Sequence, residues 1–393
     1  MHRPEVFRHR LSQRILALMA LIAPATLMFE TGCDPYAGCG GQTVNTNQCF
    51  AWPANGGSGG AGTTGSGGAG GAAGAGGAGG GIPVMCPSRE EAKPMLDANF
   101  FTPVTVESDG VLANGQCCYD VTYVEQCIGG RPFIVDEQPR VALIQARTYD
   151  PQWSVAPNLS PDVSSLSADE RAELATAWAR DGAFEHASVA SFSRFALELM
   201  AVGAPPELIS AAHEAAMEEV RHAKLCLTLA SHYAGSVLEP APFPFDGRVA
   251  VSSDLVDLAM RVTKEGAIGE TISAVIASEQ LAHAQDPAVR EALVVIAEDE
   301  ARHAELAFRT LAWAIRVGGR DVAEAISNAF VQAMRDIDVS GASENPALAA
   351  HGRLDAATLR RAAKRGMDEV LRPAMSALRL SLTHKEQFRP AIS

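Results

Sequence analysis

The chain has 393 residues, which is long for one hydrophobic core, so we expect at least two independently packed units. Many of its 35 glycines fall in one stretch, whereas the region after Ser167 is rich in Ala, Leu and Glu, so the two halves should differ in structure. The formal net charge of −14 argues against a nucleic-acid partner, because neutralising phosphates requires clustered Lys and Arg.

Residues 1–32 are typical of a bacterial export signal. Four arginines precede an apolar run from Ile15 to Phe29, which is too short to span a bilayer as a mature helix. The run ends at Thr31-Gly32-Cys33, which resembles a lipobox, although Glu30 stands where a lipobox has an aliphatic residue. We therefore predict a cell-envelope protein held by a lipid on Cys33, on a membrane facing the periplasm or the cell surface. Ordinary signal cleavage, or a disulfide at Cys33, is the alternative.

The eight cysteines fit an oxidising compartment. Cys33 is assigned to the lipid, and Cys226 falls in a predicted helix, where we expect a small core residue rather than a ligand. The other six can form three disulfides whose connectivity the sequence leaves open, and the adjacent Cys117 and Cys118 must pair elsewhere. A zinc site between Cys86 and Cys127 is the alternative, disfavoured because C-x-x-C spacing is absent. The disulfide candidates are Cys39, Cys49, Cys86, Cys117, Cys118 and Cys127.

The segments between the signal and the helical half are short and varied. Residues 33–55 form a cysteine-containing N-terminal segment, and residues 56–81 consist only of Gly, Ala, Ser and Thr, which predicts a flexible tether spanning roughly 25–30 Å. Residues 82–140 combine four cysteines with short β-prone runs, so we predict a small module held together by disulfides. Residues 141–166 connect this module to the helices.

The remaining chain is predicted to be mainly α-helical, with a four-helix bundle over residues 167–316 and further helices within 317–393. Ser167 and Glu170 form a capping box at the start of the first helix, and Pro205 follows its end. Two hairpins joined by one long connection are the connectivity of ferritin-like bundles. The helices are expected at about 167–202, 206–233, 253–284 and 287–316, followed by 321–337 and 354–382.

Two Glu-x-x-His motifs stand out in this half, Glu219 with His222 in the second helix and Glu300 with His303 in the fourth. A spacing of three places a carboxylate and an imidazole one turn apart on the same helix face, where both reach one metal ion. A single such motif often arises by chance, but one in each hairpin is a much more specific signal. The two motifs therefore predict metal ligands.

The two hairpins are also alike in sequence, since residues 217–225 align with residues 298–306. This likeness predicts one further glutamate on the first helix of each hairpin. Glu185 and Glu270 lie at heights along their helices that match the motifs, whereas Glu265 lies too far out. For Glu265 we favour an ordinary structural role, and the alternative is a hydrogen-bond partner of a ligand or a carboxylate on the path of incoming metal.

Leu, Ile and Ala share helix faces with the six groups, so all six should point into an apolar interior. Four buried carboxylates at close quarters need compensating charge, which divalent metal ions provide best. The alternative is a set of surface glutamates and hydrogen-bonded core histidines. The combination of two motifs and two matching glutamates favours metal binding.

This set resembles the ferritin-like di-iron carboxylate superfamily, in which two helices contribute one Glu each and two contribute Glu-x-x-His. The resemblance covers about 150 residues, from Ser167 to Arg316, and implies two iron ions, with manganese as the alternative. It implies terminal ligands at Glu185 and Glu270, bridging ligands at Glu219 and Glu300, and one imidazole per metal from His222 and His303.

The resemblance leaves the reaction open, because the superfamily includes ferroxidases, peroxidases, desaturases and oxygenases. We expect an oxygen- or peroxide-activating oxidoreductase, or an iron-handling protein that stores, senses or oxidises metal without an organic substrate. No cysteine follows Cys226, so the rubredoxin-type C-x-x-C pairs of rubrerythrins are absent and an enzyme would need an external electron donor. His186 points away from the ligand face, so we expect it at the surface or beside a ligand. For Asp181, as for Glu265, the alternatives are an ordinary structural role and a role beside a ligand or on the path of incoming metal.

Overall fold

The computed structural model describes residues 2–20, 43–50, 86–100, 104–113, 116–124, 133–135, 138–147, 151–156, 159–245, 249–333, 342–343 and 345–383. The chain divides into two compact units, one of residues 42–125 and a larger one of residues 1–41 and 126–393. The lipid site expected at Cys33, the glycine-rich stretch 56–81 and the disulfide candidates Cys39 and Cys127 lie outside the described residues.

The smaller unit is an antiparallel sheet with one helix. Its central strand pairs with three others, and Ala92, Leu96 and Tyr119 are in its buried core. Cys86 is bonded to Cys117, which confirms a disulfide in this module, and Cys118 is also disulfide-bonded. The elements are β1 (Thr43–Phe50), α2 (Arg89–Phe100), β2 (Thr105–Val106), β3 (Val111–Ala113) and the central β4 (Gln116–Val124).

Two features of this unit were not expected from the sequence. Strand β1 comes from before the glycine-rich stretch, so residues expected to form a separate N-terminal segment belong to the same sheet. Helix α2 forms among residues whose neighbours favour strands, and its Ala92 and Leu96 cover the sheet. The β-prone runs were therefore a good guide to the strands but not to the helix.

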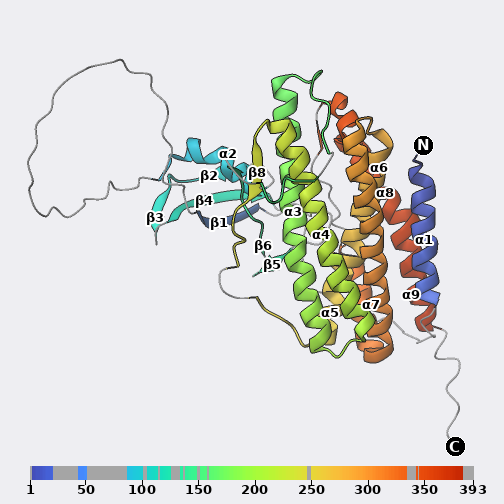
Figure 1. Cartoon of the computed structure of the whole chain (residues 1–393). Coiled ribbons are helices and arrows are strands. Elements are labelled where there is room, and N and C mark those ends of the chain that lie inside the picture. Colours follow the sequence, from blue (N-terminus) through green and yellow to red (C-terminus); the bar gives the residue numbers. More distant parts are fainter. Residues whose placement is uncertain are drawn as a thin grey trace, which may run out of the picture. The chain divides into compact units, whose positions relative to one another are not determined.

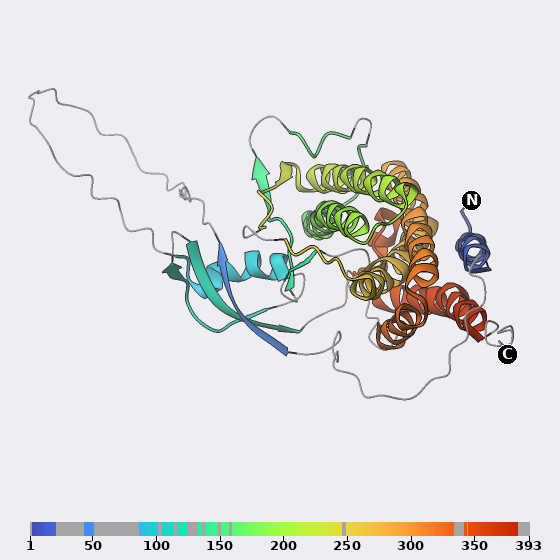
Figure 2. The same ribbon diagram turned by 90° about the horizontal axis from the view of Figure 1, so that it is seen from below.

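The larger unit is built from long packed helices (Figures 1 and 2). One hairpin consists of α3 and α4, while α5, a π-helical segment η1 and α6 form one continuous rod that packs against α7. Helices α4 and α7 pack against each other and join the two hairpins. The bounds are α3 (Ala168–Ala201), α4 (Pro206–Ala234), α5 (Leu255–Arg261), η1 (Val262–Glu270), α6 (Thr271–His283) and α7 (Pro287–Ala333).

Local sequence explains where these helices begin and end. The Ser167 hydroxyl accepts the backbone N–H of Glu170, whose side chain accepts the N–H of Ser167 at 2.9 Å, so the predicted capping box is confirmed. Asp286 caps α7 by accepting the N–H of Ala288 at 2.9 Å. The residues bounded as α7 are two helices that meet at a kink at Gly319, whose φ of 66° and ψ of −134° favour glycine, and this confirms the break predicted between residues 316 and 321.

Shorter elements complete the larger unit. Helix α1 (Pro4–Ala20) packs against α6, α7, η3 (Met367–Leu371) and α9 (Arg372–Thr383). None of the helices that the structure describes is long and apolar enough to span a membrane. The remaining elements are β5 (Ile134–Val135), β6 (Gln138–Pro139), β7 (Ile144–Arg147), β8 (Val237–Pro240), η2 (Pro346–His351) and α8 (Ala356–Gly366).

The core of the larger unit has two hydrophobic clusters along the helix axes. One includes Phe192, Leu208 and Phe308, and the other includes Trp178 and Leu229. Each long helix passes from one cluster to the other through a short polar stretch, where the predicted metal ligands lie. The packing of apolar faces on either side therefore holds a polar layer inside the helices.

Candidate metal centre

The structure brings all six predicted ligands together in this polar layer. Each of two groups offers four ligand atoms that lie within 4.8 Å of one another. The first group is Glu185, Glu219, His222 and Glu300, and the second is Glu219, Glu270, Glu300 and His303. Glu219 and Glu300 belong to both groups, as expected for residues placed between two metal ions.

The six residues come from four helical elements that surround the layer. Helix α3 supplies Glu185 and η1 ends at Glu270, while α4 and α7 supply the two Glu-x-x-His motifs. Five of the six residues are buried. The side chain of Glu185 keeps 19% of its surface exposed, so the layer opens towards solvent on the α3 side.

Several buried polar atoms of this layer point at a common centre without a hydrogen bond. Among the described residues, Oε2 of Glu219, Oε2 of Glu300 and the Nδ1 atoms of His222 and His303 are buried and unpartnered. The His222 Nδ1 lies 3.5 Å from an oxygen of each of Glu185, Glu219 and Glu300. The His303 Nδ1 lies 3.2 Å from Glu219.

Leaving such atoms unsatisfied costs about 1–3 kcal/mol each, and more when the group is charged. Two divalent cations would satisfy them together, since each would take carboxylate oxygens and one imidazole nitrogen. Oxygen-rich sets with one imidazole per metal suit iron, manganese and zinc. The residues therefore fit a pair of metal ions, and the donor set leaves the choice of metal open.

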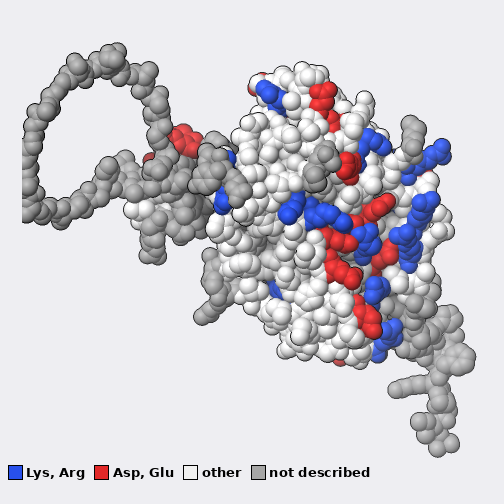
Figure 3. All heavy atoms as spheres, in the orientation of Figure 1, with Lys and Arg blue, Asp and Glu red and all other residues white. Residues whose placement is uncertain are grey.

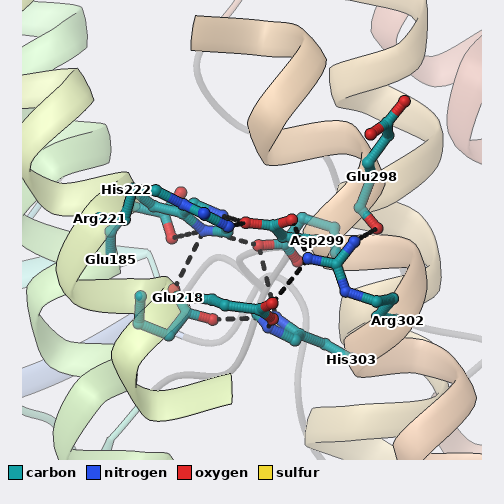
Figure 4. A network of polar contacts seen from close by, with 10 residues as sticks. Glu185, Glu218, Arg221, His222, Glu298, Asp299, Arg302 and His303 are labelled. Atoms are coloured by element: carbon teal, nitrogen blue, oxygen red, sulfur yellow. Dashed lines mark hydrogen bonds and ion pairs between the residues drawn. The ribbon is translucent and has the colours of Figure 1, made fainter. Parts of the chain in front are cut away.

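Two further carboxylates hold the histidines in place, in a crossed arrangement (Figure 4). Asp299 on α7 lies 3.0 Å from Nε2 of His222 on α4, and Glu218 on α4 lies 2.8 Å from Nε2 of His303 on α7. A carboxylate at Nε2 favours the tautomer protonated there and leaves the Nδ1 lone pair directed at the centre. Each Glu-x-x-His motif thus depends on the opposite helix for its orientation.

Two arginines extend this network to the surface. Arg302 donates to Glu218 at 2.6 Å and also to Asp299, and Arg221 donates to Asp299. The side chains of Arg221 and Arg302 are 50% and 47% exposed, so the buried histidines are two contacts away from solvent. Figure 3 shows acidic and basic side chains beside one another on this face.

The carboxylates at 218 and 299 were missed in the sequence, although a signal was present. Both motifs read acid-Glu-x-Arg-His, as Glu218-Glu219-Val220-Arg221-His222 and Asp299-Glu300-Ala301-Arg302-His303. The repeated acid and arginine lie outside the Glu-x-x-His pattern, and their roles depend on how α4 and α7 pack. A longer motif comparison would have identified them.

The charges of the layer shift the pKa values of its members. Burial lowers the pKa of His303, but its contacts with the carboxylates of Glu218 and Glu219 outweigh burial and raise that pKa to about 9. The same balance, with Asp299 as the strongest raising contact, puts the pKa of His222 well above its ordinary value. Burial, and then the charge of Glu219, raise the pKa of Glu185. Without metal, protons on the imidazoles would therefore provide the compensating positive charge.

The carboxylates around the histidines shift the other way. Burial disfavours the charge of Asp299, but hydrogen bonds from His222 and Arg221 lower its pKa to about 2. Hydrogen bonds from His303 and Arg302 likewise outweigh burial and lower the pKa of Glu218. Both carboxylates are therefore ionised at neutral pH, as partners of a histidine N–H must be.

Glu265 lies outside both ligand groups. It is buried and forms an ion pair with Arg194 at 3.4 Å, and Ser191 donates to it at 3.5 Å. Arg194 also donates to the carbonyl of Ile134 at 2.6 Å and so attaches the segment around β5 to α3. The expectation that Glu270 rather than Glu265 joins the centre agrees with this geometry.

The other residues singled out by sequence have structural contacts. Asp181 accepts from the buried Arg353 at 2.7 Å. The His186 ring packs edge-on against Trp153, with 4.8 Å between ring centroids. Cys226 is a free, buried cysteine one helical turn after His222, and burial raises its thiol pKa well above the ordinary value, so it is a neutral core residue.

Comparisons of the chain with protein-family models, with curated proteins and with solved structures give no match. Any function assigned to the chain therefore rests on its sequence and on the geometry of this layer.

Proposed function

We propose that α3, α4, the α5–η1–α6 rod and α7 form a ferritin-like bundle around a di-iron centre, and that the protein is an oxygen- or peroxide-activating oxidoreductase. The observation that supports this best is the pair of four-atom groups sharing Glu219 and Glu300. Shared carboxylates would hold two metal ions a few ångströms apart, as in the superfamily that the motifs resemble.

Charge balance supports two divalent ions in this layer. Four ionised glutamates carry four negative charges, which two divalent ions neutralise while both histidines stay neutral. One metal ion, with the other imidazole protonated, would leave one negative charge uncompensated among groups that are almost fully buried. We therefore propose that the site fills with two ions rather than one.

Two iron(II) ions would supply the electrons that reduce oxygen or peroxide. The chain would hold them through the six ligands, and Asp299 and Glu218 would keep the imidazoles oriented while the oxidation state changes. Because Glu185 is the most exposed ligand, small substrates and metal would approach from the α3 side. The only free cysteine among the described residues is buried, so we propose an external electron donor.

The second candidate is an iron-handling protein without an organic substrate. A surface hollow of about 390 Å³ is lined by residues of α3 and of the C-terminal segment, and none of the six ligands lines it. A site reached by metal and small oxidants, away from this hollow, would suit a ferroxidase or a sensor as well as an enzyme. The proposed cell-envelope location and the lipid on Cys33 rest on the N-terminal sequence pattern alone.

One experiment separates the two candidates. The full chain is loaded with iron(II) without oxygen and then given peroxide with a chemical electron donor. An oxidoreductase consumes peroxide over many turnovers at constant bound iron, whereas an iron-handling protein oxidises its iron once and stops. The matched variants are Glu219→Ala, which removes a shared ligand, and Glu214→Ala, which changes an exposed glutamate on the same helix. If the Glu219→Ala chain is as active as the Glu214→Ala chain, the proposed centre is not the site.

A further inference from the structure

Helix α1 overlaps the predicted export signal, yet it is packed into the larger unit. Its Leu11, Ile15 and Met19, spaced one turn apart along one face, are at most 2% exposed and belong to the same hydrophobic cluster as Phe308. They pack against a surface formed by α6, α7, η3 and α9, hereafter the α1 groove. The apolar run that predicts export begins at Ile15, so Ile15 and Met19 belong both to the predicted signal and to this packed surface.

Polar contacts give this packing specificity. Arg8 is 3% exposed, and its Nε lies 2.7 Å from Glu369 on η3 while its Nη1 lies 3.7 Å from Glu279 on α6. At one end of the groove, Nε2 of His2 lies 2.8 Å from the hydroxyl of Ser278. A buried arginine between two carboxylates that are far from it in sequence is a feature of a built interface, and a signal segment has no need of it.

The opposite side of α1 faces solvent. Arg10 and Arg14 are exposed, and Figure 3 shows basic side chains along the edge of the unit where α1 lies. The helix therefore presents its apolar stripe and Arg8 to the α1 groove, while the exposed Arg14 reaches Glu305 on α7 at 3.1 Å from the rim of this surface. The surface under α1 thus offers apolar side chains to Leu11, Ile15 and Met19 and carboxylates to the arginines.

We propose that the α1 groove is a docking site for α1 of the same chain, and that docking withholds the N-terminal segment from any receptor that reads it as an export signal. A receptor that reads the start of the apolar run must contact Ile15 and Met19, which the groove buries, so the two uses exclude each other. A chain that folds before export would retain α1 in the groove. This inference is independent of the metal centre.

The test changes the groove and leaves the signal sequence intact. Glu369→Arg replaces the nearest partner of Arg8 by a like charge at a half-exposed position, and Glu214→Arg makes the same change on the exposed face of α4. The full chain is produced in bacterial cells, the exported fraction is measured, and hydrogen exchange of residues 11–19 is followed in the purified chain. Thermal unfolding of both variants checks that the rest of the unit stays folded.

We expect slow hydrogen exchange of residues 11–19 in the parent chain and in Glu214→Arg. In Glu369→Arg this exchange should be faster by about tenfold or more, and only this variant should show a larger exported fraction. If Glu369→Arg leaves α1 protected, the double variant with Glu279→Gln removes both partners of Arg8. Protection that persists in the double variant overturns the assignment of the groove, as does exchange of α1 in the parent at the rate of an unfolded peptide. Release of α1 with an unchanged exported fraction overturns the withholding of the signal.

Discussion

Metal binding to the centre should release protons and should strengthen steeply with pH. The pKa of His303 is about 9, because its contacts with Glu218 and Glu219 outweigh burial, and the pKa of His222 is also well above the ordinary value. At pH 7 only about 1% of His303 would be neutral, so its proton must be displaced at a cost of about 3 kcal/mol. Affinity for the metal held by this histidine should therefore rise about tenfold per pH unit up to about pH 9 and then level off.

The same shift has the opposite effect on the chain without metal. Because folding raises the pKa of His303, its proton stabilises the fold fully below the unfolded value of 6.5, and this contribution of about 3 kcal/mol is lost as the pH rises through about 9. The unfolding temperature without metal should therefore fall between pH 6.5 and 9, and stabilisation by added metal should grow over the same range.

Calorimetric titration with manganese(II), in buffers of different ionisation enthalpy, measures the released protons directly. At pH 7 we expect about two protons per chain, one from each imidazole, when both metals bind. Release of fewer than about one proton, or an affinity that is the same at pH 6 and pH 8, would refute the proposed competition between protons and metal at the imidazoles.

Three further predictions concern single residues. Glu270→Ala should lose about half of the bound metal, whereas Glu265→Ala should keep its metal and unfold at a lower temperature. Metal analysis showing the reverse would overturn the ligand assignment. Asp299→Asn should weaken the metal held by His222 by roughly 10–100-fold in a titration, because the imidazole loses its orienting carboxylate, and an unchanged affinity would argue against that role. Thiol labelling should find one free thiol, that of Cys226, and it should react only after the chain is denatured. Four or more thiols that react without denaturant would contradict disulfide bonding in the small module.

The long helices could be predicted because their signals are local. The Ser167 capping box and the break before Pro287 depend on neighbouring residues, and the structure keeps both boundaries. Glu185 and Glu270 were identified by counting residues from the hairpin turns, which works because the rise per residue in a helix is constant. Such counting needs no knowledge of tertiary packing.

Features that depend on packing were missed. The π-helical turns of η1 contain hydrogen bonds of longer range than an α-helix, and apolar periodicity does not distinguish the two. The contacts of Asp299 and Glu218 with histidines exist only because α4 and α7 lie side by side. The docking of α1 joins Arg8 to Glu369, a pair separated by most of the chain, so a pattern that favours an export signal gave no hint of it.

Metal content of the full chain tests the central proposal most directly. After loading with iron(II) without oxygen and removal of loose metal, we predict about two iron ions per chain in the parent, about one in His303→Ala, and little in Glu219→Ala, which lacks a ligand shared by both ions. Oxygen should then produce the near-ultraviolet absorption of ferric iron in the parent. A chain that folds equally well without metal and binds none, or a Glu219→Ala variant that still holds two ions, would contradict the proposal.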